Sequence, residues 1–162
     1  MIQTVLKKKR TFVWVFIASA AILTVVVGWI TILRVFKGVS ASSDAMQRRL
    51  RQEFVQIPPP KSAREVQYSE VPSIGHGGVS KYFATDLSRA EITAYYDAEL
   101  AAHGWIFRRE TKLTSWGKDY GELMRFYCKD SISGELYFTG REEANLGFRY
   151  SFGLSWGLYS CN

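Results

Sequence analysis

The chain has few of the residues that build metal and redox centres. Its 162 residues include two cysteines and two histidines, and three of its four prolines are consecutive. Acidic residues are absent from positions 1–37, whereas positions 38–162 hold 15 acidic and 15 basic residues. The formal charge of +6 therefore lies entirely in the first 37 residues. A nucleic-acid-binding domain carries its basic excess on the folded domain, so this distribution argues against one.

A long apolar run without charge covers residues 12–33 and contains 22 residues. At 1.5 Å per residue a helix of this length spans about 33 Å, enough for the hydrocarbon core of a bilayer. Four basic residues precede the run, and Arg34 and Lys37 follow it. We therefore predict a basic cytoplasmic tail at 1–11, a transmembrane helix at 12–35 and an exported C-terminal domain, in accordance with the positive-inside rule. The bilayer is thus the first expected partner.

A cleaved signal peptide is the alternative interpretation of this run. Residues 18–20 and 39–41 resemble cleavage motifs. The apolar region before the first motif is too short for a signal peptide, and the apolar region before the second is too long. Ala20, Thr24 and Gly28 lie four residues apart, so they share one helix face. Small residues at this spacing allow another membrane helix to approach closely, although ordinary small residues of a membrane helix give the same pattern.

Residues 36–60 are expected to connect the anchor to the domain. A helix is predicted over 42–57, where Met46, Leu50, Phe54 and Ile57 recur at helical spacing. Two interpretations are open for it: a helix lying on anionic headgroups, or a solvated stalk that continues the membrane helix. Three consecutive prolines at 58–60 predict a stiff extended spacer. The folded domain is therefore expected over 61–162.

The domain sequence predicts an α+β fold with one helix packed on an antiparallel sheet, in the order β-β-α-β-β-β-β. The helix at 89–103 has the clearest signals: Ser88 and Glu91 form a capping box, and Gly104 occupies the position that favours a left-handed residue. Alternation of large and small side chains along 146–159 predicts a strand with one buried face. The expected strands are 65–71, 79–85, 105–112, 122–129, 135–139 and 146–159.

The two cysteines, Cys128 and Cys161, both follow the predicted anchor. An even pair in an oxidising compartment indicates a disulfide. A reactive thiol pair is the alternative, but it usually has a C-x-x-C spacing, which is absent here.

The search for chemistry yields no catalytic, cofactor-binding or metal-ligating set. Ser155 lies in a G-x-S-x-G motif, but no helix and no Asp or His follows it, so a serine hydrolase is disfavoured. His76 and His103 have no partner at metal-ligand spacing. Trp116 and Tyr120 lie at a long hairpin tip, where exposed aromatic residues commonly make protein contacts; folding back onto the sheet is the alternative.

One stretch of the domain resembles a known module. It reads Tyr95-Tyr96-x-x-Glu99-Leu100-x-x-His103-Gly104-Trp105. This resembles the Y-Y-x-x-E-L-x-x-x-G-W helix-to-strand corner of small, single-pass-anchored, mostly uncharacterised proteobacterial envelope proteins. Residues 155–161, from S-W-G to the last cysteine, are similar to the final strand of that group. The resemblance covers about residues 79–162 and implies a fold and an envelope location, but no reaction, cofactor or catalytic residue.

These observations lead to one expected function and three alternatives. We expect an inner-membrane protein whose periplasmic domain binds another envelope protein as an accessory or adaptor subunit, without nucleic acid, cofactor or enzymatic activity. An immunity protein that neutralises an envelope-targeted toxin is the first alternative. A subunit held mainly by its membrane helix is the second, and a hydrolase that uses Ser155 is the third.

Overall fold

The computed structural model describes residues 2–115, 118–140, 147–157 and 161, and gives the backbone alone for 2–23, 36, 37, 115 and 118–120. The chain divides into two compact units, Met1–Ala41 and Ser42–Asn162, which are described separately. The elements are α1 (Ile2–Val55), β1 (Arg64–Pro72), β2 (Gly77–Ala84), α2 (Arg89–Ala102), β3 (Ile106–Ser115), β4 (Lys118–Lys129), β5 (Ile132–Phe138) and β6 (Tyr150–Trp156).

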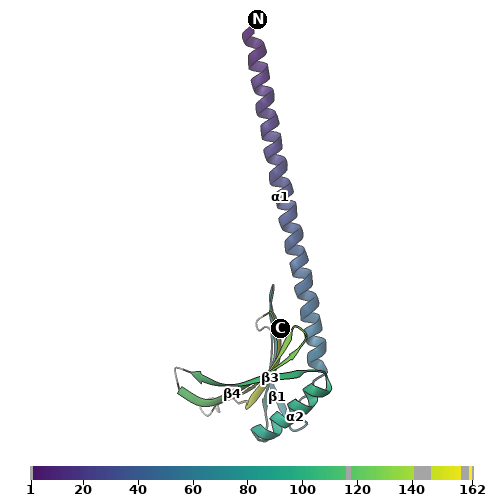
Figure 1. Ribbon diagram of the computed structural model, residues 1–162, viewed down its shortest axis with the longest axis vertical. Helices are drawn as coiled ribbons and strands as arrows, with labels where there is room; N and C mark the ends of the chain where they lie inside the picture. Colours follow the sequence, from purple (N-terminus) through teal and green to yellow (C-terminus); the bar gives the residue numbers. More distant parts are fainter. Residues whose placement is uncertain (1, 116–117, 141–146, 158–160, 162) are drawn as a thin grey trace. The chain divides into compact units, whose positions relative to one another are not determined.

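The first unit consists of the N-terminal part of α1 (Figure 1). Its described apolar side chains are exposed, among them Trp29, Ile30 and Leu33. By length and composition, the helix is apolar enough to cross a membrane. An exposed helix surface of this composition is costly in water, which is consistent with the predicted anchor.

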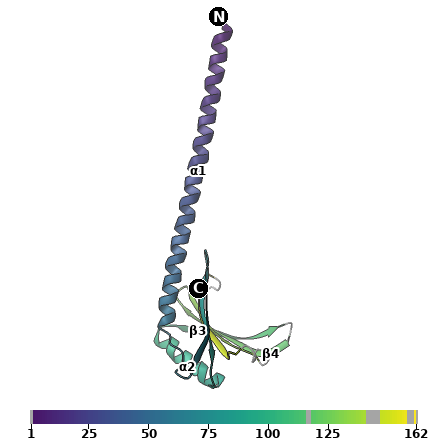
Figure 2. The ribbon, with the colours of Figure 1, turned by 180° about the vertical axis from the view of Figure 1, so that it is seen from behind.

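The second unit contains a six-stranded, fully antiparallel sheet in the order β1-β2-β6-β5-β4-β3. Strands β3 and β4 of this sheet are labelled in Figure 2. The predicted α+β class and the order β-β-α-β-β-β-β from β1 onward are confirmed, but the unit also contains the last turns of α1, so two helices pack on the sheet where one was expected. β6 follows every other strand in the sequence, yet it pairs with β2 on one side and β5 on the other. β1 and β3 are therefore the two edges of the sheet.

The core lies on one face of the sheet, and aromatic side chains dominate it. The predicted alternation is confirmed over residues 150–154, because Tyr150, Phe152 and Leu154 are at most 1% exposed, but the strand is shorter than the expected 146–159, and Phe148 and Trp156 are only partly buried. The Phe152 ring stacks on Phe54 of α1, with centroids 5.9 Å apart, and on Tyr96 of α2, with centroids 4.7 Å apart. The last turns of α1 and the whole of α2 therefore cover the same face of the sheet.

The segment 42–57 differs from both interpretations offered for it. Its apolar stripe is real, but Leu50, Phe54 and Ile57 are buried in the core of the domain, not against lipid or water. Gln47 of the same helix donates to Glu70 of β1 at 2.7 Å. The folded unit accordingly begins at Ser42, about twenty residues before the expected boundary at Lys61. The apolar periodicity was sufficient to predict the helix but could not show which surface it would meet.

The three prolines also belong to the domain. Pro60 is buried, and the Pro58 carbonyl accepts a hydrogen bond from the Tyr95 hydroxyl at 2.9 Å. The Ala63 amide donates to the Pro60 carbonyl at 2.8 Å. The proline run is thus a bend held against α2, where a free spacer was expected.

Helix α2 begins and ends as its sequence predicts. The Ser88 side chain accepts from the Glu91 amide, and the Glu91 carboxylate accepts from the Ser88 amide at 2.7 Å, which completes the capping box. At the other end the Trp105 amide donates to Leu100 at 2.9 Å and the Gly104 amide donates to Ala101 at 3.0 Å. This is a Schellman motif, and Gly104 has the left-handed φ of 80° that the motif requires.

Replacing Gly104 tests this corner without a steric contribution, because a Cβ there would meet nothing within 4 Å. We expect Gly104→Val to reduce the free energy of unfolding by about 1–2 kcal/mol, the cost of a left-handed conformation for a residue with a Cβ. Gly104→Asn should cost less, since Asn tolerates this region. Urea unfolding of both variants measures the difference, and equal losses would contradict the backbone explanation.

Candidate functional site

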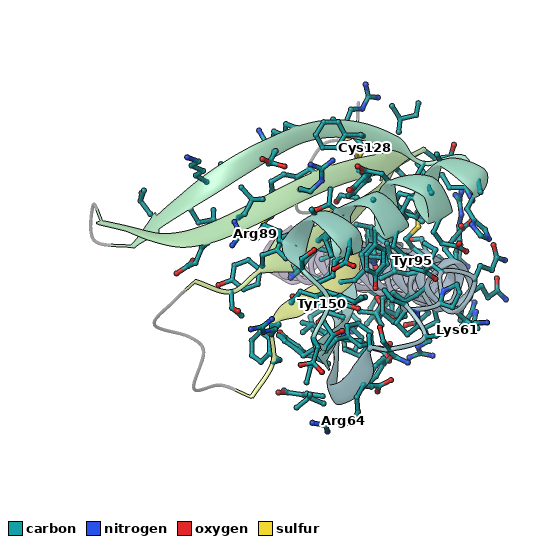
Figure 3. The ribbon with its side chains drawn as sticks, turned by 90° about the horizontal axis from the view of Figure 1, so that it is seen from below. Lys61, Arg64, Arg89, Tyr95, Cys128 and Tyr150 are labelled. Carbon is teal, nitrogen blue, oxygen red and sulfur yellow. A yellow bond between two sulfur atoms is a disulfide. The ribbon has the colours of Figure 1, made fainter. Side chains whose placement is uncertain are left out.

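The predicted disulfide is present in the structure. Cys128 of β4 and Cys161 are bonded, with Cα atoms 5.5 Å apart and a sequence separation of 33 residues (Cys128 is labelled in Figure 3). Closing a loop of this length stabilises a folded chain by about 3–4 kcal/mol in the chain-entropy description. The pair holds residue 161 against β4, so the cysteines have a structural role and are not free thiols in this state.

Ser155 lies within strand β6 and not at a strand-to-helix turn, so the geometry of a nucleophile elbow is not formed. Its side chain is buried and donates to a Glu135 carboxylate oxygen at 2.8 Å. The hydroxyls of Ser155 and Ser133 are 3.1 Å apart. A serine nucleophile needs a base that accepts its proton and is oriented by a third group. The partners of Ser155 in the described part of the chain are instead a carboxylate and a second hydroxyl.

Glu135 is a partly buried acid on the face of the sheet opposite to the helices. It pairs in register with Phe126 on β4 and Gly153 on β6. Burial raises the pKa of Glu135, and the hydrogen bond from Ser155 opposes that rise in pKa without cancelling it. Its carboxylate therefore costs folding free energy when it is charged.

The other predicted contact residues are not tested by the described part of the chain. Trp116 and the Tyr120 side chain lie outside the described residues, and so does the Ala20 side chain. Thr24 and Gly28 are exposed on the first unit, and a Cβ on Gly28 would meet nothing within 4 Å. The hairpin tip and the small-residue face therefore remain predictions.

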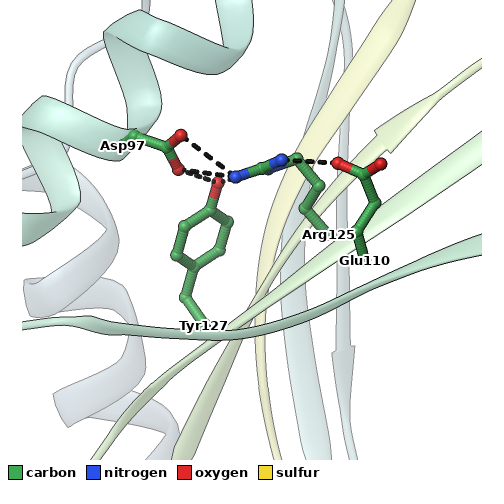
Figure 4. A network of polar contacts seen from close by, with 4 residues as sticks. All are labelled: Asp97, Glu110, Arg125 and Tyr127. Atoms are coloured by element: carbon green, nitrogen blue, oxygen red, sulfur yellow. Dashed lines mark hydrogen bonds and ion pairs between the residues drawn. The ribbon is translucent and has the colours of Figure 1, made fainter.

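A polar network joins α2 to the sheet (Figure 4). Arg125 of β4 donates to both oxygens of Asp97 at 3.0 Å, and the Tyr127 hydroxyl donates to the same carboxylate at 2.8 Å. Arg125 also pairs with Glu110 of β3, and its guanidinium lies 4.4 Å from the Phe107 ring centroid. Burial raises the pKa of Tyr127, so its hydroxyl remains a donor. These groups satisfy one another, which fits a structural clamp for α2 better than a ligand site.

Strand β1 and the turn after it present one exposed apolar surface of the second unit, and the other edge strand, β3, exposes Ile106 (57%) and Phe107 (45%). Exposed fractions are 41% for Val66, 45% for Tyr68, 56% for Val71 and, in the following turn, 60% for Ile74. β1 is an edge strand that pairs with β2 alone among the described strands. An edge strand offers unpaired backbone donors and acceptors, and natural proteins usually protect such edges with charge or bulges. β1 has one irregularity, between Glu65 and Gln67, and three large apolar side chains that remain exposed, with Ile74 in the turn as a fourth.

The sequence signals did not single out this edge. Val66 and Val71 lie among charged and polar residues, a composition that predicts a strand but not its position in the sheet. Only the pairing order identifies β1 as an edge.

The described residues contain no group of three His, Cys, Asp or Glu side chains that could hold a metal ion. His103 instead contacts the Glu99 carbonyl at 2.8 Å, at the end of α2.

Comparison with known proteins does not assign the chain to a family. No family model matches the chain, and no curated protein or solved structure was found to match it. The functional argument therefore depends on the residues and geometry described above.

Glu135→Gln tests the cost of the buried carboxylate. A carboxyl whose folded pKa is raised stabilises the fold below its unfolded pKa, and that contribution is lost as the pH rises through the folded pKa. We therefore expect Glu135→Gln to raise the thermal midpoint at pH 7 and to have little effect at pH 4, below the ordinary carboxyl pKa of 4.5. Glu122→Gln is the matched control. A variant that is less stable than the wild type at pH 7 would contradict the assignment.

Proposed function

We propose that the chain is a single-pass inner-membrane protein whose domain, residues 42–162, binds another envelope protein on the periplasmic side. The apolar, exposed first unit supports the anchor. The basic residues on its N-terminal flank favour export of the domain. A disulfide within the domain suits an oxidising compartment.

The observation that carries the binding function is the exposed apolar edge at β1. Extended segments of partner proteins commonly add a strand to such an edge: backbone hydrogen bonds supply affinity, and side-chain contacts supply specificity. Val66, Tyr68 and Val71 offer apolar contacts along that edge. These side chains are exposed in the free domain and would be buried by a protein partner. Their burial removes apolar surface from water and so favours binding.

The short chain segment between the proposed anchor and the domain limits the distance from the membrane at which the partner can bind. Eight residues separate Leu33, the last residue of the apolar run, from Ser42. Even fully extended, they reach about 30 Å. The domain therefore works close to the membrane surface, as an accessory or adaptor subunit of an envelope assembly would.

Site-specific photo-crosslinking tests the edge strand. A photoreactive amino acid at Val71 should give one adduct of defined mass in intact cells, and the same partner should appear from position 66. Thr111 is exposed on the opposite edge strand β3 and is the matched control. Adducts of equal yield at Val71 and Thr111, or none at Val71, would refute β1 as the contact. The identity of the partner separates an adaptor, which is linked to an envelope subunit, from an immunity protein, which is linked to a toxin.

Thiol labelling tests the orientation. After reduction, a membrane-impermeant maleimide should label Cys128 and Cys161 in intact spheroplasts, because the proposed domain lies outside the inner membrane. A cysteine placed at Thr4 in a Cys128→Ala/Cys161→Ala background should react only after lysis. Labelling of the two native cysteines in lysed spheroplasts alone would refute the exported domain.

A further inference from the structure

A cleft of about 1000 Å³ lies at the end of the domain where β1 begins and β2 ends. The first turn of α2 and two short described segments, residues 139–140 after β5 and 147–149 before β6, complete its described wall. Three arginines line it, Arg64, Arg89 and Arg149, against one described acid, Asp86. A concave surface with this charge excess concentrates the positive potential at its mouth.

Two of the three cleft arginines differ from the basic residues that form ion pairs elsewhere on the domain. Within the described part of the chain, Arg64 and Arg149 are exposed and form no ion pair. Elsewhere on the domain Arg51 pairs with Glu70 and Lys129 pairs with Glu53, both at 2.7 Å. Two guanidinium groups of the cleft thus have no carboxylate partner among the described residues.

The wall of the cleft is held in place before any ligand arrives. Arg89 donates to the Gly121 carbonyl at 2.8 Å, and its guanidinium lies 5.3 Å from the Phe138 ring centroid. The Arg149 amide donates to Phe83 at 2.8 Å, and the Arg149 carbonyl accepts from the Thr139 amide at 3.1 Å. The guanidinium of Arg89 and the backbone of Arg149 are therefore positioned in advance, so this part of the wall loses little freedom when a ligand binds. In the view of Figure 3, Arg64 and Arg89 lie on either side of Tyr150.

We propose that this cleft binds an acidic peptide segment of the partner protein. The inference rests on the proposed protein-binding function and adds the chemical class of the ligand. Guanidinium forks match carboxylates in geometry and can bind them in a bidentate manner. A cleft of this volume, at the upper limit of ordinary ligand pockets, is large for one inorganic anion and accommodates several side chains.

The cleft lies far from the residue at which the domain begins. The Ser43 hydroxyl, next to the first residue of the domain, accepts from the Gly75 amide at 3.2 Å in the turn between β1 and β2. The cleft lies at the other end of that hairpin, where Arg64 pairs in register with Ala84. The eight residues of β2 span about 25 Å. The cleft is thus a hairpin's length from the residue at which the chain leaves for its anchor.

A charge-reversal experiment tests the cleft with the full chain in phosphatidylcholine nanodiscs. The probe is a fluorescent ten-residue peptide rich in glutamate, and the same peptide with glutamine is its neutral counterpart. We expect the glutamate peptide alone to bind at low salt. Arg64→Glu/Arg149→Glu should weaken that binding by about tenfold or more, because two attractive charges become repulsive. Arg48→Glu/Arg108→Glu changes the net charge equally at exposed arginines outside the cleft and should cost less than about twofold.

Each other outcome overturns the inference. Equal weakening by the two double variants would show attraction by net charge, with no role for the cleft. Equal binding of the glutamine peptide, or no binding of the glutamate peptide, would exclude acidic recognition. If the protein instead binds phosphatidylglycerol vesicles and the cleft variant abolishes that binding, the cleft contacts the bilayer. The Val71 crosslink reports separately on the proposed function, since it persists if only the cleft assignment fails. Both variants should retain the Cys128–Cys161 disulfide and the wild-type thermal midpoint, which shows that they fold.

Discussion

The aromatic contact around Phe152 is the interaction on which the domain depends. Phe152 projects from a central strand and stacks on Phe54 from one helix and on Tyr96 from another. Segments separated by about a hundred residues of sequence thus meet at one side chain. Each buried aromatic ring removes a large apolar area from water, and the stacked geometry adds a further stabilising contribution. Without either helix the face of β6 would be open to solvent, so the folded unit must include the last turns of α1.

Local signals in the sequence were sufficient where the chain interacts with itself over short distances. Ser88, Glu91 and Gly104 specify the ends of α2 through hydrogen bonds within a few residues, and the structure has those bonds. The alternation along β6 also predicted its buried face, because successive side chains of a strand point to opposite faces of the sheet. The disulfide followed from the cysteine count.

Local sequence patterns did not predict which distant segments of the chain pack against one another. The stripe that contains Leu50 and Phe54 predicted an amphipathic helix, but lipid, water and the domain's own sheet are all compatible with such a stripe. The pairing order of the strands likewise depends on contacts across the whole domain, so the sequence did not identify β1 as an edge. The cleft arginines, Arg64, Arg89 and Arg149, are scattered along 86 residues, and only the fold places them on one wall.

The placement of β6 also determines when the domain can mature during synthesis. Because β6 is made after every other strand and occupies a central position, the nascent chain first holds two incomplete half-sheets, β1–β2 and β3–β4–β5. The inner strands β2 and β5 expose unpaired edges until β6 arrives, and such edges are prone to associate with other chains. Cooperative closure is therefore a late event, and a chaperone that shields extended strands would act on this protein while β6 is still being synthesised.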